Sequence, residues 1–123
     1  MGLETNDPRG FVGIVIYTFS ELGKFPHFTE VLYGIEEEQI PFWIEEEAFQ
    51  SEDILSSAYR AANSSVFGVG ICCSHQEIAI HHSNLRKEKP IFNISIGQCS
   101  RKTARILGAN AARLIKGIPF EII

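Results

Sequence analysis

The sequence has few of the features that mark membrane, secreted or disulfide-linked proteins. None of its apolar runs approaches the roughly 18 residues that a membrane-spanning helix needs. Its three cysteines are an odd number, and their spacing matches neither a disulfide framework nor a zinc site. Residues 1–10 are polar and do not follow the basic and then apolar layout of a secretory signal. We therefore expect a cytoplasmic protein with free thiols and no membrane partner.

Patterns that bind nucleotides, zinc or nucleic acid are also missing. Gly68 and Gly70 lie within a strand pattern and do not open a helix, so neither a Walker loop nor a dinucleotide-binding loop is present. His81 and His82 are adjacent and would face opposite sides of a strand, which is the wrong geometry for a two-histidine metal site. A net charge of −4 opposes binding to phosphate backbones. These absences argue against an ATPase, a dehydrogenase and a nucleic-acid-binding protein.

The charges are unevenly distributed along the chain. Residues 1–62 hold twelve acids and three bases, whereas residues 63–123 hold three acids and eight bases. Such asymmetry is expected of a surface that meets differently charged partners on different faces. The alternative is that folding mixes the two halves in space, and the sequence leaves both possibilities open.

Strand and helix patterns alternate over 123 residues, the length of one ordinary domain. Five short apolar runs predict strands at residues 11–17, 42–44, 66–72, 77–81 and 90–96. The connection from the third strand to the fourth is too short for a helical crossover, so these two strands should pair antiparallel. The glycines of the third strand should let a helix or a neighbouring backbone approach closely.

Three amphipathic segments predict helices. The first has Pro26 in its first turn and ends before Pro41. The second begins at an N-cap on Ser51, and the third is capped by Ser100 and closed by Gly117.

Together these elements predict an α/β fold. We expect a three-layer sandwich, with helices covering a mixed, mostly parallel five-stranded sheet that has one antiparallel strand, similar to anticodon-binding domains. Residues 11–123 should form a single domain, and residues 1–10 a flexible N-terminal tail.

Cys72 and Cys73 end the third expected strand, just before His75. A cysteine and a histidine at the carboxyl end of a strand could act as nucleophile and base. Neighbouring strand residues face opposite sides, however, so at most one cysteine can join a site, and no third group is evident to orient His75. Core thiols beside an exposed turn histidine are the preferred interpretation, and a thiol-dependent or small-molecule-binding α/β enzyme is the alternative.

Glu36, Glu37 and Glu38 end the first expected helix, where the helix dipole is negative. Each carboxylate is unfavourable there by about 0.3–1 kcal/mol if it is held close to the terminus. Their oxygens could bind a hard divalent cation or a basic partner surface. Screening by solvent at an exposed helix end is the alternative.

Two segments of the chain resemble the dehydratase medium-subunit family. Residues 34–42 (GIEEEQIPF) resemble its helix-to-strand motif, and residues 108–120 (GANAARLIKGIPF) resemble its C-terminal signature. One branch of this family is the medium subunit of cobalamin-dependent diol and glycerol dehydratases, which is substantially longer. The other branch is the small subunit of the factor that reactivates these enzymes, and a chain of 123 residues suits this second branch. A dehydratase medium subunit, or a fragment of one, is the alternative.

The resemblance implies a chaperone-like role without catalytic residues in this chain. In the family, the factor's large subunit hydrolyses ATP, and the small subunit exchanges places with the dehydratase medium subunit. The exchange lets damaged cobalamin leave, so that intact adenosylcobalamin can enter. The implied partners are the large ATPase subunit and, during exchange, the dehydratase large subunit. The implied location is the cytoplasm or a bacterial microcompartment within it.

The resemblance also implies a metal ligand. In the family, a glutamate of the helix-end motif binds a divalent cation (Mg or Ca) at the contact with the large subunit, and Glu37 matches that position. We expect Glu36, Glu38, Arg113 and Lys116 to lie at the same interface. A solvated helix face is the alternative for the two basic residues. Whether the client takes glycerol or propane-1,2-diol, and whether the isolated chain forms a homo-oligomer, stays open.

Overall fold

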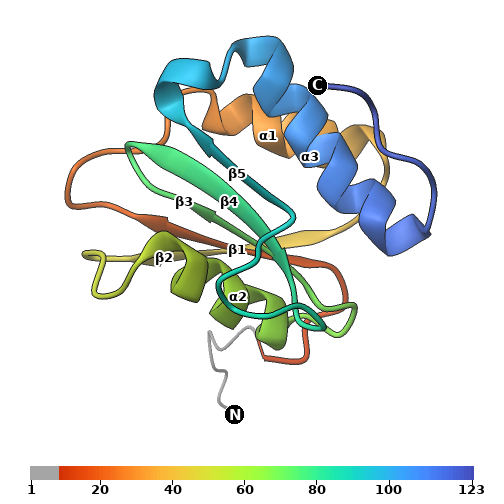
Figure 1. Cartoon of the computed structure of the whole chain (residues 1–123), viewed down its shortest axis with the longest axis horizontal. Helices are drawn as coiled ribbons and strands as arrows, with labels where there is room; N and C mark the ends of the chain where they lie inside the picture. Colours follow the sequence, from red (N-terminus) through yellow and green to blue (C-terminus); the bar gives the residue numbers. More distant parts are fainter. Residues whose placement is uncertain (1–8) are drawn as a thin grey trace, which may run out of the picture.

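Five strands form one mixed sheet in the order β2-β1-β3-β4-β5 (Figure 1). The structure is a computed structural model that describes residues 9–123, so the tail expected at residues 1–10 falls almost wholly outside the described residues. The elements in chain order are β1 (Ile14–Phe19), α1 (Phe28–Glu37), β2 (Phe42–Glu47), α2 (Ile54–Ser64), β3 (Val69–Cys73), β4 (Glu77–His82), β5 (Phe92–Ser95), the 3-10 turn η1 (Ile96–Gln98) and α3 (Arg101–Lys116). Within this part of the chain, no helix is both long and apolar enough to cross a membrane.

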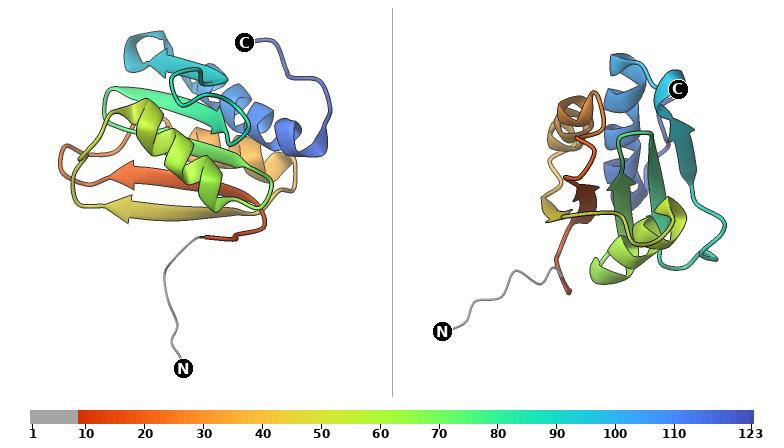
Figure 2. Two further views of the ribbon diagram at one scale, coloured as in Figure 1. Left: turned by 60° about the horizontal axis from the view of Figure 1, so that its bottom comes forward. Right: turned by 90° about the vertical axis from the view of Figure 1, so that its left-hand side faces the viewer.

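The strand directions confirm the predicted sheet. β1 pairs parallel with β2 and with β3, whereas β4 runs antiparallel to both β3 and β5. Since β5 reverses direction again, β4 is the one strand that opposes the other four. Helices α1 and α3 cover one face of the sheet and α2 covers the other, which gives the three expected layers (Figures 1 and 2).

A glycine of β3 sets the distance between the sheet and α2. A Cβ atom at Gly70 would collide with the backbone of Ala58, Ala61 and Ala62 in α2. The helix therefore lies directly on the strand, with its small side chains inside the core. This confirms the predicted close approach at Gly70, whereas Gly68 lies before the strand.

Two helix ends also match their predictions. The Ser100 hydroxyl accepts a hydrogen bond from the Thr103 N–H at 3.1 Å, which caps α3. Gly117 then closes the helix in the left-handed conformation, with φ of 70°.

Other predicted boundaries were wrong. Pro26 precedes α1, because the N-cap is His27 in a left-handed conformation. α2 is capped by Asp53 and not by Ser51, since the Asp53 carboxylate accepts from the Ser56 N–H at 2.7 Å. β3 starts at Val69, because Gly68 has φ of 77° and turns the chain, which leaves the preceding Val66 exposed.

Candidate functional site

The three glutamates that end α1 have different environments. Glu36 is exposed, Glu37 is 58% exposed, and the Glu38 side chain is only 13% exposed. Glu38 is the C-cap residue, and its N–H donates to the Ile35 carbonyl at 3.1 Å. The acidic run predicted to act as one group therefore separates into one largely buried and two accessible carboxylates.

The charge of Glu38 is balanced by two basic side chains from the last turns of α3. Lys116 Nζ donates to Glu38 Oε1 at 2.7 Å and to the Glu38 backbone carbonyl at 3.2 Å, and Arg113 Nε donates to Oε2 at 3.0 Å. Hydrogen bonding from Lys116, reinforced by Arg113, holds the pKa of Glu38 below its ordinary value. The dipole conflict inferred from the sequence is thus compensated by cations that lie far along the chain.

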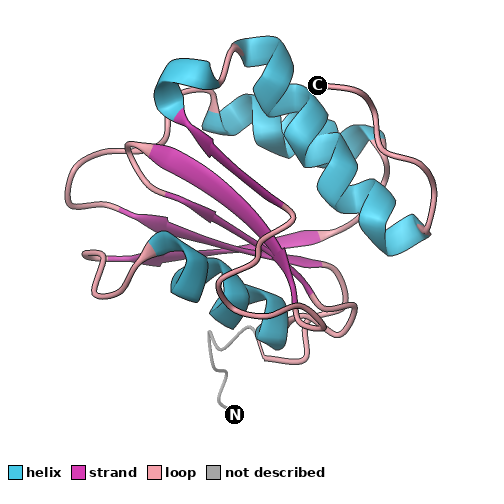
Figure 3. Cartoon of the chain, viewed as in Figure 1, coloured by secondary structure: helices cyan, strands magenta, loops and turns pink. Residues whose placement is uncertain are grey.

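The same part of α3 holds the C-terminal segment 118–123, a coil that runs back along the helix (Figure 3). The buried Asn110 side chain donates to the Glu121 carbonyl at 3.0 Å and accepts from the Glu121 N–H at 2.7 Å. Arg113 also donates to the Pro119 carbonyl at 3.1 Å. The motif at residues 108–120 therefore joins the end of α1 to the C-terminal segment through one helix.

Glu37 is paired with a different residue of α3. Its carboxylate lies 3.2 Å from a terminal nitrogen of Arg105. The other terminal nitrogen of Arg105 donates to Glu30 at 3.2 Å, and Glu30 also accepts from Arg101 at 3.2 Å. The Arg105 guanidinium lies over the Tyr33 ring, 5.4 Å from its centroid.

An open groove of about 460 Å³ lies over this charge cluster. It is bounded by Glu30 and Glu37 of α1, by Arg101 and Arg105 of α3, and by Glu121 of the C-terminal segment. Sequence reasoning did not include Glu30 and Arg105. The seven-residue spacing of Glu30 and Glu37, which places both on one face of a helix, was the available signal.

Within the described residues, the donor groups do not form a complete metal site. No three His, Cys, Asp or Glu side chains in residues 9–123 are arranged to hold a metal ion. Glu37 does offer an accessible carboxylate, and carboxylate oxygens are the ligands that Mg²⁺ and Ca²⁺ prefer. Glu37 can therefore supply one carboxylate ligand to a metal ion, and the described residues hold no complete site.

The cysteine alternative finds no support in the geometry. Cys72 packs in the core under α2 and Cys73 in the core under α1 and α3, so the two thiols face opposite sides of the sheet as predicted. Burial raises the pKa of Cys72 to about 12 and raises the pKa of Cys73 well above its ordinary value. His75 lies in the turn between β3 and β4, and no hydrogen bond joins it to either thiol in the described structure.

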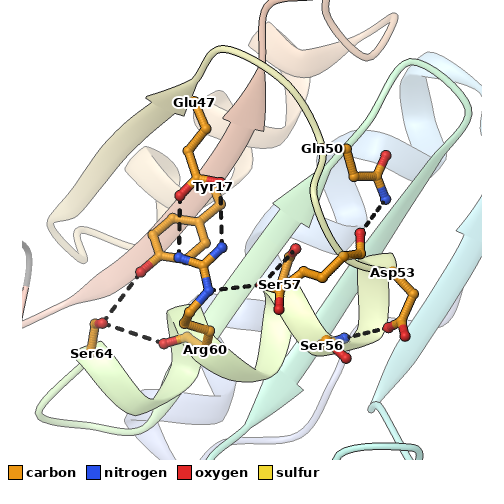
Figure 4. A network of polar contacts seen from close by, with 9 residues as sticks. Tyr17, Glu47, Gln50, Asp53, Ser56, Ser57, Arg60 and Ser64 are labelled. Atoms are coloured by element: carbon orange, nitrogen blue, oxygen red, sulfur yellow. Dashed lines mark hydrogen bonds and ion pairs between the residues drawn. The ribbon is translucent and has the colours of Figure 1, made fainter.

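A second open cavity, of about 410 Å³, lies beside the carboxyl end of β2. Its charged groups form a closed network in which Arg60 donates to Glu52 at 2.8 Å and to Glu47 at 3.2 and 3.3 Å (Figure 4). The Arg60 guanidinium also lies 4.5 Å from the centre of the Tyr17 ring. These contacts tie α2 to the first two strands, which is a structural role.

Comparison with known proteins identifies the class of the domain and then its family. The sequence of this α/β sandwich matches the dehydratase medium subunit family over residues 13–121. The chain therefore belongs to the dehydratase medium-subunit family, and the resemblance seen in the two motifs is confirmed.

Similar proteins cover nearly the same length. The chain is 42% identical over 106 residues to the propanediol dehydratase-reactivating factor small subunit of Citrobacter freundii, covering 86% of this chain and 89% of that protein. It is 43% identical over 108 residues to the protein of the same description from Salmonella typhimurium, covering 88% and 89%.

Solved structures show the same fold. A diol dehydratase-reactivating factor complexed with ADP and Mg²⁺ aligns with a TM-score of 0.81 and 38% identity, over 90% of this chain and 98% of that chain. A glycerol dehydratase reactivase aligns with a TM-score of 0.79 and 28% identity, over 90% and 97%.

Proposed function

We propose that this chain is the small subunit of a factor that reactivates a cobalamin-dependent diol or glycerol dehydratase. The observation that carries the proposal is the similarity to reactivating-factor small subunits along almost the whole domain. The geometry agrees with a binding role, because accessible carboxylates lie at the end of α1 and the thiols are buried. The chain would work in the cytoplasm or in a bacterial microcompartment.

The proposed mechanism is subunit exchange. A chain with the fold of the dehydratase medium subunit can take that subunit's place on the dehydratase large subunit, which opens the enzyme and releases damaged cobalamin. ATP hydrolysis in the factor's large subunit would then shift the chain between its two partners. Such a switch requires two interfaces of similar free energy, so that a change of nucleotide can decide between them.

Glu37 is the proposed metal ligand at the contact with the large subunit. Its carboxylate is accessible and lines the groove, and Mg²⁺ is named with the related diol dehydratase-reactivating factor. Glu36 would add negative charge beside it. Arg113 and Lys116 both pair with Glu38, so the proposed part of these three residues in the interface is to fix the shape of the helix end at its edge.

Omission of this chain from a reactivation assay tests the proposal. Inactivated dehydratase is mixed with the large subunit, ATP, magnesium and fresh adenosylcobalamin, with or without this chain. We expect enzyme activity to recover only in the complete mixture. Equal recovery in both mixtures would contradict the proposed role, as would recovery that needs no ATP.

Thiol titration tests the alternative of a thiol-dependent enzyme. A thiol with a pKa of about 12 is ionised to roughly one part in ten thousand at pH 8, and the thiolate is the reactive form. The native chain has three buried cysteines. We expect a disulfide reagent to modify, on average, less than one thiol per chain within minutes. In guanidinium chloride all three should react at once. A rapidly reacting thiol in the native chain would favour the enzyme alternative.

A further inference from the structure

We infer that Arg105 is the internal counterion of Glu37, and that Arg105 and Glu30 together set the divalent-cation concentration at which this chain binds its partner. The inference rests on the proposed function, in which Glu37 is a metal ligand. It adds a competition between a guanidinium of this chain and the metal ion for one carboxylate.

The contacts of Arg105 place it between two carboxylates on one face of α1. One terminal nitrogen lies 3.2 Å from Glu37 and the other 3.2 Å from Glu30. Glu30 is only 15% exposed, whereas Glu37 is 58% exposed. The guanidinium is further held over the Tyr33 ring. Arg105 is therefore anchored on Glu30 and Tyr33, and Glu37 is its more weakly held partner.

The arrangement leaves one donor of Arg105 unsatisfied. Its Nε is buried and has no hydrogen-bond partner in the described structure. A buried donor without an acceptor is unfavourable, so the geometry shared between two carboxylates is not the best one for this guanidinium. When Glu37 is drawn away, Arg105 keeps its contacts with Glu30 and Tyr33. The contact that is lost is an exposed ion pair, so release of Glu37 carries little penalty.

A divalent cation at Glu37 has to displace the guanidinium, because both bind the same carboxylate oxygens. An exposed ion pair of this kind contributes about 0.2–1 kcal/mol. Arg105 should thus raise the cation concentration needed for partner binding by roughly 1.4- to five-fold. Glu30 acts in the opposite direction, since it draws Arg105 away from Glu37.

The test is a magnesium titration of the association between this chain and the large subunit, with MgCl2 as the only variable and nucleotide absent. We expect Arg105→Gln to lower the midpoint concentration of MgCl2 about 1.4- to five-fold, and Glu30→Gln to raise it. In the double variant the midpoint should equal that of Arg105→Gln alone, because Glu30 acts only through Arg105. Arg101→Gln also removes a positive charge that pairs with Glu30, but Arg101 makes no contact with Glu37 in the described structure. It should therefore shift the magnesium midpoint less than Arg105→Gln does.

The outcomes separate the inference from the proposed function. Loss of the magnesium response in Glu37→Gln, combined with an unchanged midpoint in Arg105→Gln, would overturn the role of Arg105 alone. Strictly additive effects of Arg105→Gln and Glu30→Gln would overturn it as well, because they would show a general effect of charge. A magnesium response that survives in Glu37→Gln would overturn the proposed metal ligand, and this inference with it.

Thermal unfolding of each variant checks that it folds. If Arg105→Gln does not fold, Glu30→Gln still reports on the competition between Arg105 and the cation.

Discussion

Gly108→Ala should destabilise the domain by about 3 kcal/mol, because an added side chain in a close-packed site forces the backbone apart. A Cβ atom at Gly108 of α3 would collide with the carbonyl group and Cα of Val31 in α1. On the other side of the same crossing, a Cβ atom at Gly34 would collide with the Arg105 carbonyl and the Ala109 nitrogen. These obstacles are backbone atoms, so the two helices have to separate and expose the core beneath them. The gain of about 1 kcal/mol in helix propensity does not offset this.

Gly97→Ala is the matched control for this substitution. Nothing lies within 4 Å of a Cβ atom at Gly97. Its substitution should change the free energy of unfolding by no more than about 0.5 kcal/mol. Urea denaturation followed by circular dichroism measures both variants. If Gly108→Ala proved as stable as the unchanged chain, the close contact between α1 and α3 would be wrong.

The fold was largely predictable because its signals are local. The short connection between β3 and β4 required antiparallel pairing, and the cap on Ser100 and the stop at Gly117 followed from side-chain and backbone chemistry within one turn. The errors lie where several local choices compete. Ser51 and Asp53 can both cap a helix, and only the observed hydrogen bond to Ser56 decides between them.

The candidate site was less predictable, because its partners are distant in the sequence. The helix-end glutamates were recognised from the dipole argument, yet the cations that pair with them come from α3. Lys116 and Glu38 are separated by 78 positions, and no local sequence pattern predicts such a pair. The position of Arg105 between two carboxylates depends on the crossing of α1 and α3, which the sequence does not reveal.

The uneven charge distribution along the chain also could not be placed in space from the sequence alone. Acidic residues of the first half meet basic residues of the second half across the α1–α3 pair, as in the contacts of Glu30 and Glu38. For this face of the domain, the alternative that folding mixes the two halves is therefore correct. At the end of α1, Glu37 is an accessible carboxylate beside the groove, and it is paired with Arg105.

Glu37→Ala should weaken binding of the large subunit about 30-fold or more, because removing one member of an interfacial charge pair costs about 2 kcal/mol or more. The isolated chain should keep its stability within about 0.5 kcal/mol, since Glu37 is 58% exposed and has one exposed ion pair. Binding is measured by calorimetry at saturating MgCl2, and stability by thermal unfolding of the free chain.

Glu36→Ala is the comparison that gives the result its meaning. It removes the same charge from the neighbouring residue of the same helix end, and Glu36 makes no ion pair among the residues that the structure describes. If the acidic helix end only attracted a basic partner by its charge, the two variants would bind the large subunit equally weakly. A directed bond to a shared metal makes Glu37 far more sensitive, and it makes the loss vanish when magnesium is removed by a chelator. Equal losses in both variants, or an unchanged affinity in Glu37→Ala, would show that the helix end acts by charge alone or lies outside the interface.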